Sequence, residues 1–214
     1  MFKLNICSNP TCKHNAVSLI KDGIILDEPG YCIDHSLSKE ETEQAIFDYI
    51  LKNEKIVGLN ASGLNFYDMD FSGKRFYGCN FQRCSFSNIH SENCRFRISF
   101  LDFAVFSDCN LIESNAQFSS FAGATFSHVL FTNSDLVHNN FCGITAYQSS
   151  FDDSDLYNSR FIGASLYNTS FRNCNVKNTD FTDITQENVS FKLSNTRAAF
   201  FLTTYKEINN ESLF

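Results

Sequence analysis

Three cysteines and one histidine near the N-terminus are the residues of this 214-residue chain whose types and spacing best suit chemistry. They form two short pairs, Cys7 with Cys12 and Cys32 with His35, joined by the 19 residues from 13 to 31. Sulfur and imidazole ligands arranged in such pairs are typical of one tetrahedral zinc ion. We therefore predict a zinc site at these four residues. Four protein ligands leave no open coordination position, so we expect a structural metal rather than a catalytic one.

The stretches CSNPTCKHNA and GYCIDH resemble small bacterial zinc knuckles. The chain departs from them in the long loop from Val17 to Gly30 and in Thr11, which stands where glycine is usual. His14 is a competing fourth ligand, although the two-residue spacing between Cys32 and His35 fits better. The alternative interpretation is a set of reduced thiols beside a surface histidine.

A five-residue register fills most of the remaining chain. Of the 26 positions taken every fifth residue from Phe66 to Phe191, 16 are Phe, 5 are Leu, 2 are Ala and 1 is Val. The two exceptions are Ser91 and Gln186. A fixed period sustained over this length indicates one structural unit copied many times.

In each five-residue unit, one side chain points inward, the next outward and the third inward, and the remaining two residues turn a corner. Residues two apart point to the same side of an extended chain, so each large residue shares an interior with a small one two positions earlier. Five of the nine cysteines fall at this small inward position, where we expect free, buried thiols rather than disulfides; they are Cys79, Cys84, Cys94, Cys109 and Cys174. Glycines recur near the corners, where positive φ is tolerated, and Cys142 also falls there.

The stretches CNFQR, SDLVH, SDLYN, ASLYN and TDFTD resemble the consensus of the pentapeptide-repeat family, over residues 56–195. The resemblance implies an all-β fold, a right-handed, four-sided parallel β-helix of about seven coils. Residues 20 apart then lie above one another, so that Phe66 and Phe86 belong to one column of rings and Phe121 and Phe141 to another.

Two segments flank the predicted β-helix. Residues 1–37 carry the knuckle-like segment, and residues 38–55 are predicted to form a helix that covers the open end of the core, with Ser38 and Glu41 as a capping box. At the other end, we predict that the register stops after Asn195. Residues 196–214 form either a second cap or a contact between two copies of the chain, since relatives that dimerise do so through their carboxy-terminal ends.

Charge suggests one alternative function. The formal net charge is −7, and no Lys or Arg occurs from Leu101 to Ser159, a stretch that carries seven acids. Some pentapeptide-repeat proteins mimic DNA and modulate type II topoisomerases such as gyrase. The acids fall on all four predicted sides rather than on one stripe, which weakens this interpretation. The acidic surroundings also disfavour direct binding of nucleic acid.

Four outward apolar residues mark a candidate binding patch around one corner of the rod, namely Ile98, Phe100, Phe103 and Val105. A contiguous exposed apolar patch indicates a docking surface. The sequence shows no clustered catalytic groups, no apolar run long enough to span a membrane and no charged leader, so we expect a cytoplasmic chain without a membrane span. We predict a non-enzymatic interaction or scaffold module with an unidentified protein partner.

Overall fold

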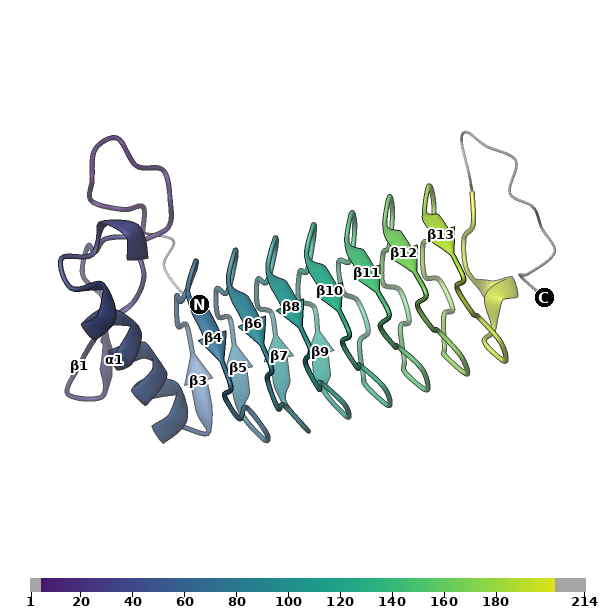
Figure 1. Cartoon of the computed structure of the whole chain (residues 1–214), viewed down its shortest axis with the longest axis horizontal. Coiled ribbons are helices and arrows are strands. Elements are labelled where there is room, and N and C mark those ends of the chain that lie inside the picture. The colour runs from purple at the N-terminus through teal and green to yellow at the C-terminus, as the bar shows by residue number, and fades with distance from the viewer. Residues whose placement is uncertain (1–4, 203–214) are drawn as a thin grey trace.

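The computed structural model describes residues 5–202 and shows a parallel β-solenoid with a small N-terminal cap (Figure 1). One seven-stranded sheet runs the length of the rod in the order β4, β6, β8, β10, β11, β12, β13, which gives about seven coils. A four-stranded sheet, β3, β5, β7 and β9, lines a second side. Each of these strands has three residues: Lys55–Val57 (β3), Asn65–Tyr67 (β4), Arg75–Tyr77 (β5), Ser85–Ser87 (β6), Arg95–Arg97 (β7), Val105–Ser107 (β8), Asn115–Gln117 (β9), Thr125–Ser127 (β10), Thr145–Tyr147 (β11), Ser165–Tyr167 (β12) and Thr185–Glu187 (β13).

Every rung of the rod joins residues 20 apart. The strands pair in parallel in this register, as Phe66 with Phe86 and Phe76 with Phe96. Two further columns of single bridges complete the coil, one through Asn60, Asn80 and Phe100 and one through Asp70 and His90. We name the four sides the β3, β4, Asn60 and Asp70 faces. The predicted four-sided coil of four five-residue units is confirmed.

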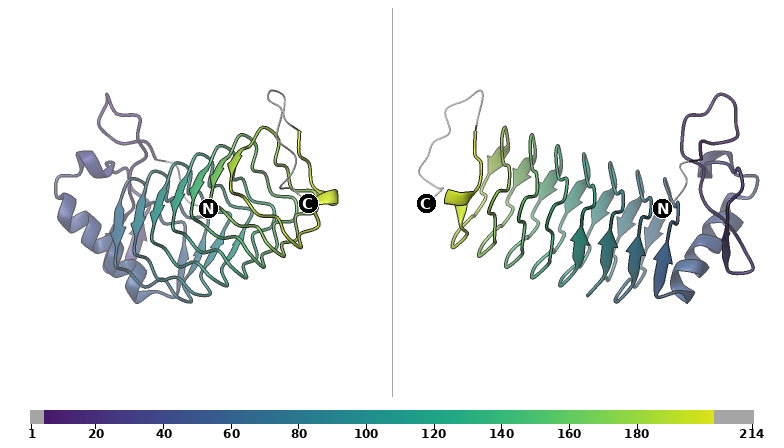
Figure 2. Two further views of the ribbon diagram at one scale, coloured as in Figure 1. Left: turned by 45° about the vertical axis from the view of Figure 1, so that its right-hand side comes forward. Right: turned by 180° about the vertical axis from the view of Figure 1, so that it is seen from behind.

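The core consists of the predicted columns of rings. The rings of Phe66 and Phe86 are parallel, with centroids 5.0 Å apart, and those of Phe121 and Phe141 are also 5.0 Å apart. Rings of neighbouring columns meet edge to face, as Phe76 and Phe81 do at 5.2 Å. Both arrangements suit the ring quadrupole. Figure 2 shows the coils stacked at even spacing, which carries this packing along the rod.

The small inward positions hold free thiols and hydroxyls, as the five-residue unit predicts. The five cysteines at these positions are buried and free. Where serine takes the position, its hydroxyl bonds the backbone, as when the Cys79 N–H donates to Ser99 Oγ (3.2 Å) and the Ser99 N–H donates to Ser119 Oγ (3.1 Å). The buried serine hydroxyls at these positions are thus satisfied by the backbone of neighbouring coils.

The corners have left-handed backbone at the second residue after each large inward residue, as at Gly73 after Phe71. Glycine takes this conformation at Gly73, Gly123 and Gly143, and Asn or Asp takes it at many other corners. Small polar residues reach this region at low cost because their side chains bond locally. The corner slots inferred from the glycines are therefore confirmed.

Helix α1 (Lys39–Lys52) covers the N-terminal end of the core. Ile46 and Ile50 are fully buried in the same core cluster as the rod, and Phe47 packs on Phe66 at 5.2 Å. The predicted capping box is wrong, because Ser38 makes no side-chain cap bond. The Thr42 hydroxyl donates instead to the Ser38 carbonyl (2.8 Å), which fastens the first turn.

The long loop from Val17 to Gly30 contains an antiparallel hairpin of β1 (Leu19–Lys21) and β2 (Ile24–Leu26). Its two turn residues, Asp22 and Gly23, have φ of 51° and 73°. Positive φ at both positions is the geometry that Asp-Gly favours in two-residue hairpins. Ile20 and Ile25 pack against the core, so the hairpin belongs to the cap.

At the carboxy end, pairing continues past Asn195, where we predicted that the register stops. A 3₁₀ turn, η2 (Thr196–Ala198), interrupts the coil, after which Phe201 stacks on Phe181 at 5.0 Å. The Phe181 N–H donates to the Phe200 carbonyl (2.8 Å), as in an ordinary coil. Residues 203–214, which complete the predicted cap or dimer contact, lie outside the described residues. No helix in the described range is long and apolar enough to cross a membrane.

Candidate functional site: a Cys/His cluster beside an apolar patch

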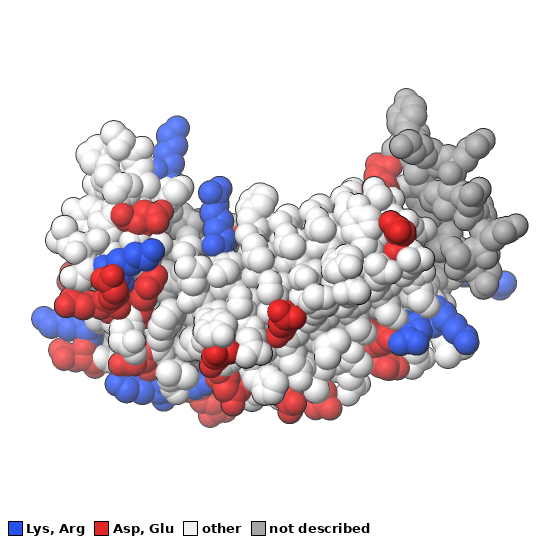
Figure 3. All heavy atoms as spheres, viewed as in Figure 1, with Lys and Arg blue, Asp and Glu red and all other residues white. Residues whose placement is uncertain are grey.

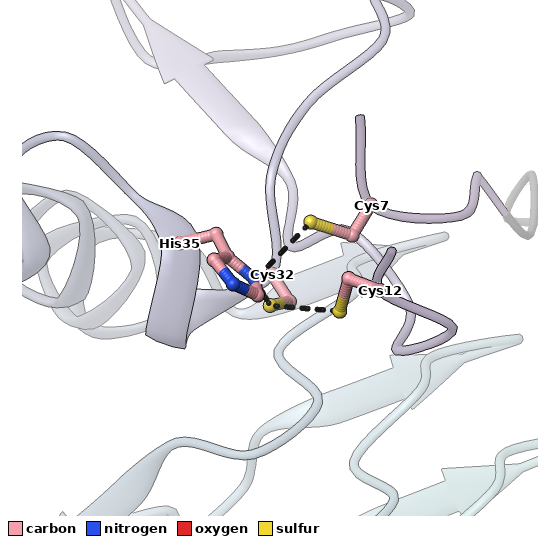
Figure 4. Close-up of side chains that lie close together, drawn as sticks. All are labelled: Cys7, Cys12, Cys32 and His35. Carbon is pink, nitrogen blue, oxygen red and sulfur yellow. Dashed lines mark hydrogen bonds between the residues drawn. The ribbon is translucent and has the colours of Figure 1, made fainter. Parts of the chain in front are cut away.

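The four predicted ligands converge at one point of the N-terminal cap (Figure 4). We call Cys7, Cys12, Cys32 and His35 the Cys/His cluster, whose ligand atoms all lie within 4.8 Å of one another. Cys12 Sγ lies 3.8 Å from Cys32 Sγ, and His35 Nδ1 lies 3.7 Å from Cys7 Sγ and 3.2 Å from Cys32 Sγ. Tetrahedral zinc with ordinary bond lengths places sulfurs about 3.8 Å apart and sulfur about 3.5 Å from nitrogen. The cluster therefore fits a zinc ion.

Two tight turns position these side chains. After Cys7, the Cys12 N–H donates to the Asn9 carbonyl (3.0 Å), and Asn9 Oδ1 accepts the Thr11 N–H (3.1 Å). The second pair stands on the 3₁₀ turn η1 (Ile33–His35), where the His35 N–H donates to the Cys32 carbonyl (3.0 Å). Side chains three apart eclipse in such a turn, which brings Cys32 and His35 together.

The pKa values of the two thiols nearest His35, Cys7 and Cys32, shift in opposite directions. Desolvation disfavours the thiolate of Cys7, but hydrogen bonds from the backbone of Cys32 and Asn9 and from neighbouring thiols outweigh it and lower the pKa of Cys7 to about 7. Desolvation raises the pKa of Cys32 to about 11. A metal ion stabilises thiolates, so binding to the cluster releases protons.

His14, the competing ligand, lies beside the cluster and next to Asp34. Its Nδ1 is 3.6 Å from Asp34 Oδ2, and together with Cys32 these two residues make a second group of possible ligands. Because Cys32 belongs to both groups, a single metal ion can be bound by only one of the two sets of ligands. The set with three thiols is the better zinc site, since zinc favours sulfur and imidazole.

Short contacts fix the knuckle to the first coils. The Asn60 N–H donates to Ser18 Oγ (2.8 Å), while the Ser18 N–H donates to the Asn60 carbonyl (2.8 Å). Asn15 Nδ2 donates to Gln82 Oε1 (3.2 Å). The cluster is therefore held in a defined position relative to the rod.

The predicted binding residues spread over more surface than one corner. Phe100 lies on the Asn60 face, Val105 on the β4 face, and Ile98 and Phe103 at the two corners that flank Phe100. The prediction of a single shared corner is wrong, because each five-residue unit turns its own corner. All four side chains are exposed, with Phe103 at 60% and Ile98 at 57%.

Sequence reasoning missed Phe118, which completes this surface. It occupies the same corner as Ile98 in the next coil, is 57% exposed, and stacks on His138 with ring centroids 4.9 Å apart. A search of the sequence at the spacing of one full coil finds it. We call Ile98, Phe100, Phe103, Val105 and Phe118 the outer apolar patch.

A groove of about 380 Å³ separates the knuckle from the rod. Lys13, His14 and Asp34 line its knuckle side, and Arg83 and Phe103 line its solenoid side. The Arg83 guanidinium lies 5.9 Å from the centre of the Phe103 ring. We call this the knuckle groove; through Phe103 it is continuous with the outer apolar patch.

The acids of the middle coils are engaged in contacts between coils. Each of the seven acids between Leu101 and Ser159 makes a hydrogen bond or an ion pair with a side chain of a neighbouring coil. Asp152, for example, lies 2.8 Å from Arg172 Nη2. Asp102 and Asp152 are only 8% exposed. In the view of Figure 3, Lys and Arg lie toward the two ends of the rod, and Asp and Glu are spread between them without one continuous stripe. This arrangement does not favour a DNA mimic.

Comparison with known proteins identifies the repeat. The profile of the pentapeptide repeat region matches residues 124–201, and that of pentapeptide repeats in eight copies matches residues 75–111 and 99–136. No curated protein sequence matches significantly.

Solved structures of similar fold include full-length QnrB1, a plasmid-mediated fluoroquinolone resistance protein. It is 20% identical, with a TM-score of 0.42, over 67% of this chain and 86% of QnrB1. The pentapeptide repeat protein Rfr23 from the cyanobacterium Cyanothece 51142 is 12% identical, with a TM-score of 0.41, over 73% of this chain and 96% of its own. With matching profiles over 75–201 and a coil of four five-residue units, this chain belongs to the pentapeptide-repeat family.

Proposed function

We propose that this protein is a non-enzymatic protein-interaction module whose binding surface is the outer apolar patch. The observation that carries the proposal is the placing of Ile98, Phe103 and Phe118 at corners with φ of 53°, 58° and 55°. Bulky and β-branched residues are disfavoured in this left-handed region, which Gly, Asn and Asp occupy at many other corners. Their side chains remain more than half exposed, and Phe103 and Phe118 contact the next coil at the surface, at Gly123 and His138, rather than the core. Strain retained at such exposed residues supports a binding role.

We propose further that the Cys/His cluster holds a structural zinc ion that fastens the cap. Zinc would join the turn at Cys7 and Cys12 to the turn at Cys32 and His35, and so fix one side of the knuckle groove. Small segments with little core of their own depend on such an ion for folding.

The zinc proposal is tested by metal analysis of protein purified without added zinc. We expect about one zinc per chain, lost in Cys12→Ser and retained in Cys142→Ser, which alters a thiol outside the cluster. A content below roughly 0.2 zinc per chain would refute the assignment.

The interaction proposal is tested by affinity capture with three forms of the protein: wild type, Ile98→Asn/Phe118→Asn and Leu130→Asn. Leu130 is also outward and exposed (44%), but lies on the Asp70 face. We expect a specific partner with wild type and Leu130→Asn that the double variant loses. Equal capture by all three would overturn the proposal. Supercoiling by purified gyrase should be unchanged, and inhibition or protection at micromolar protein would favour the DNA-mimic alternative.

A further inference from the structure

The knuckle groove and the outer apolar patch together specify the chemistry of the partner. We propose that they bind an acidic protein segment in which carboxylates flank apolar side chains; this inference rests on the proposed interaction function. The cap and the rod each supply part of the surface, as Lys13 comes from the knuckle and Arg83 from the coils.

Cations without acidic partners border the patch. Within residues 5–202, Lys13, Arg83 and Arg97 form no ion pair. Arg83 lies against the Phe103 ring, and Arg97 directly precedes Ile98 and bonds the side-chain oxygen of Gln117. An apolar strip with a guanidinium at each end is complementary to apolar side chains between carboxylates.

The carboxylates beside these cations are already engaged, including Asp135, which accepts hydrogen bonds from Asn115 Nδ2 (2.8 Å) and from the Gln117 amide that Arg97 also contacts. Asp34 lies 3.6 Å from His14, and the buried Asp102 accepts hydrogen bonds from Gln82 Nε2 (2.9 Å) and from the Ala122 N–H (3.1 Å). The local surface therefore offers positive charge to a ligand, although the whole chain has a net charge of −7.

Side chains rather than backbone must recognise this ligand. The Phe100 N–H donates to the Cys79 carbonyl (2.9 Å) in the preceding coil, and the Leu101 N–H donates to the Ser120 carbonyl (2.7 Å) in the following coil. Because the ladder along this face is paired on both sides, a partner cannot add a strand here. Its affinity then depends on the pattern of apolar and charged side chains.

The same cations would attract nucleic acid, but a polyanion long enough to leave the patch would meet acids farther along the rod. Asp153 is exposed in one of those coils, and Asp108 is exposed nearer the patch, at the corner that follows Val105. A short acidic segment avoids this repulsion. The observations therefore favour a peptide.

The test is to select, from a random peptide display library, the peptides that bind the full-length protein. We expect enriched peptides with net negative charge and at least two aromatic or aliphatic side chains. Synthetic copies are then measured by fluorescence anisotropy. Binding should weaken at least about tenfold in Arg83→Glu/Arg97→Glu and in Ile98→Asn/Phe118→Asn, and should weaken with added salt. Arg160→Glu, on the Asn60 face three coils beyond Phe100, is the matched control, and thermal melting checks that each variant is folded.

Several outcomes would overturn the inference. These are selection of basic or uncharged peptides, no binder that depends on Arg83 and Arg97, tighter binding of single-stranded DNA of equal charge, or occupation of the patch by a second copy in sedimentation. One result separates the two proposals. If a captured partner no longer binds Ile98→Asn/Phe118→Asn but still binds Arg83→Glu/Arg97→Glu, the proposed interaction function stands and only the acidic nature of the ligand is refuted.

Discussion

The ring of Phe103 lies over Gly123, which occupies the same corner in the next coil. Two of its carbons are 2.7 Å from the place that a Cβ on Gly123 would occupy. Real Cβ atoms do not approach other atoms this closely, so the exposed ring and the glycine depend on each other. The outer apolar patch is thereby fixed to the next coil.

Substitution of Gly123 separates the contribution of this contact from that of backbone conformation. Gly123→Ala meets both a φ of 66° and the Phe103 ring, and we expect a loss of about 2 kcal/mol in the free energy of unfolding. Gly143→Ala has nearly the same φ (65°) and nothing within 4 Å, so it should lose about 1 kcal/mol. Urea denaturation measures both, and equal losses would show that the Phe103 contact is unimportant.

A second prediction concerns strain at Ile98. Ile98→Asn keeps a φ of 53° with a residue that tolerates it, so we expect a gain of about 1 kcal/mol in the free energy of unfolding. The control is Val105→Asn, a substitution in strand β8 that should lose about 0.5 kcal/mol because β-branched residues favour strands. Denaturant midpoints compare them. Destabilisation by Ile98→Asn would mean that this side chain serves folding rather than binding.

The sequence predicted the rod well because each coil contacts only its neighbours, so one local rule determines the whole. The register from Phe66 placed the ring columns and buried cysteines such as Cys84. The gathering of Cys7 and His35 followed from ligand spacing.

The features that sequence reasoning missed lie outside the repeat, across its coils or at its carboxy end. The hairpin turn at Asp22 lies in the cap, outside the repeat, although Asp-Gly between two apolar stretches is a hairpin signal. Phe118 joins Ile98 only across coils, at the spacing of one full coil, whereas the predicted patch follows the chain from Ile98 to Val105. Thr196 places a polar residue where the apolar series would continue, yet backbone pairing and ring stacking resume at Phe201 in the same register.

A third prediction concerns the junction between cap and rod. Lys74 Nζ donates to the carbonyls of Leu51 (2.8 Å) and Asn53 (3.0 Å) at the end of α1. A cation there satisfies free carbonyls and complements the helix dipole. Lys74→Met should therefore cost about 1 kcal/mol and speed hydrogen exchange in the last turn of α1. Lys55→Met, a cation over Tyr77 that touches no helix carbonyl, is the control, and unchanged exchange in Lys74→Met would contradict the assignment.

The last prediction is that stability falls in alkali because of the buried thiols. Burial raises the pKa of Cys84 and of Cys94 from 9.0 to about 12. Below pH 9 the thiol is protonated in both states and the full stability is present. Above pH 9 only the unfolded chain loses the proton, so stability declines as pH rises from 9 toward 12, by about 1.4 kcal/mol per thiol at pH 10.

Urea denaturation of wild type and Cys84→Ala at pH 7.5 and pH 10 measures this effect. Cys84→Ala removes one titrating thiol, so its loss between the two pH values should be smaller than that of wild type by about 1.4 kcal/mol. Ile89→Val, which removes buried side-chain volume but no thiol, should lose as much as wild type. Equal losses in wild type and Cys84→Ala would show that Cys84 ionises as readily in the folded rod as in the unfolded chain, which is incompatible with a thiol buried in the apolar core.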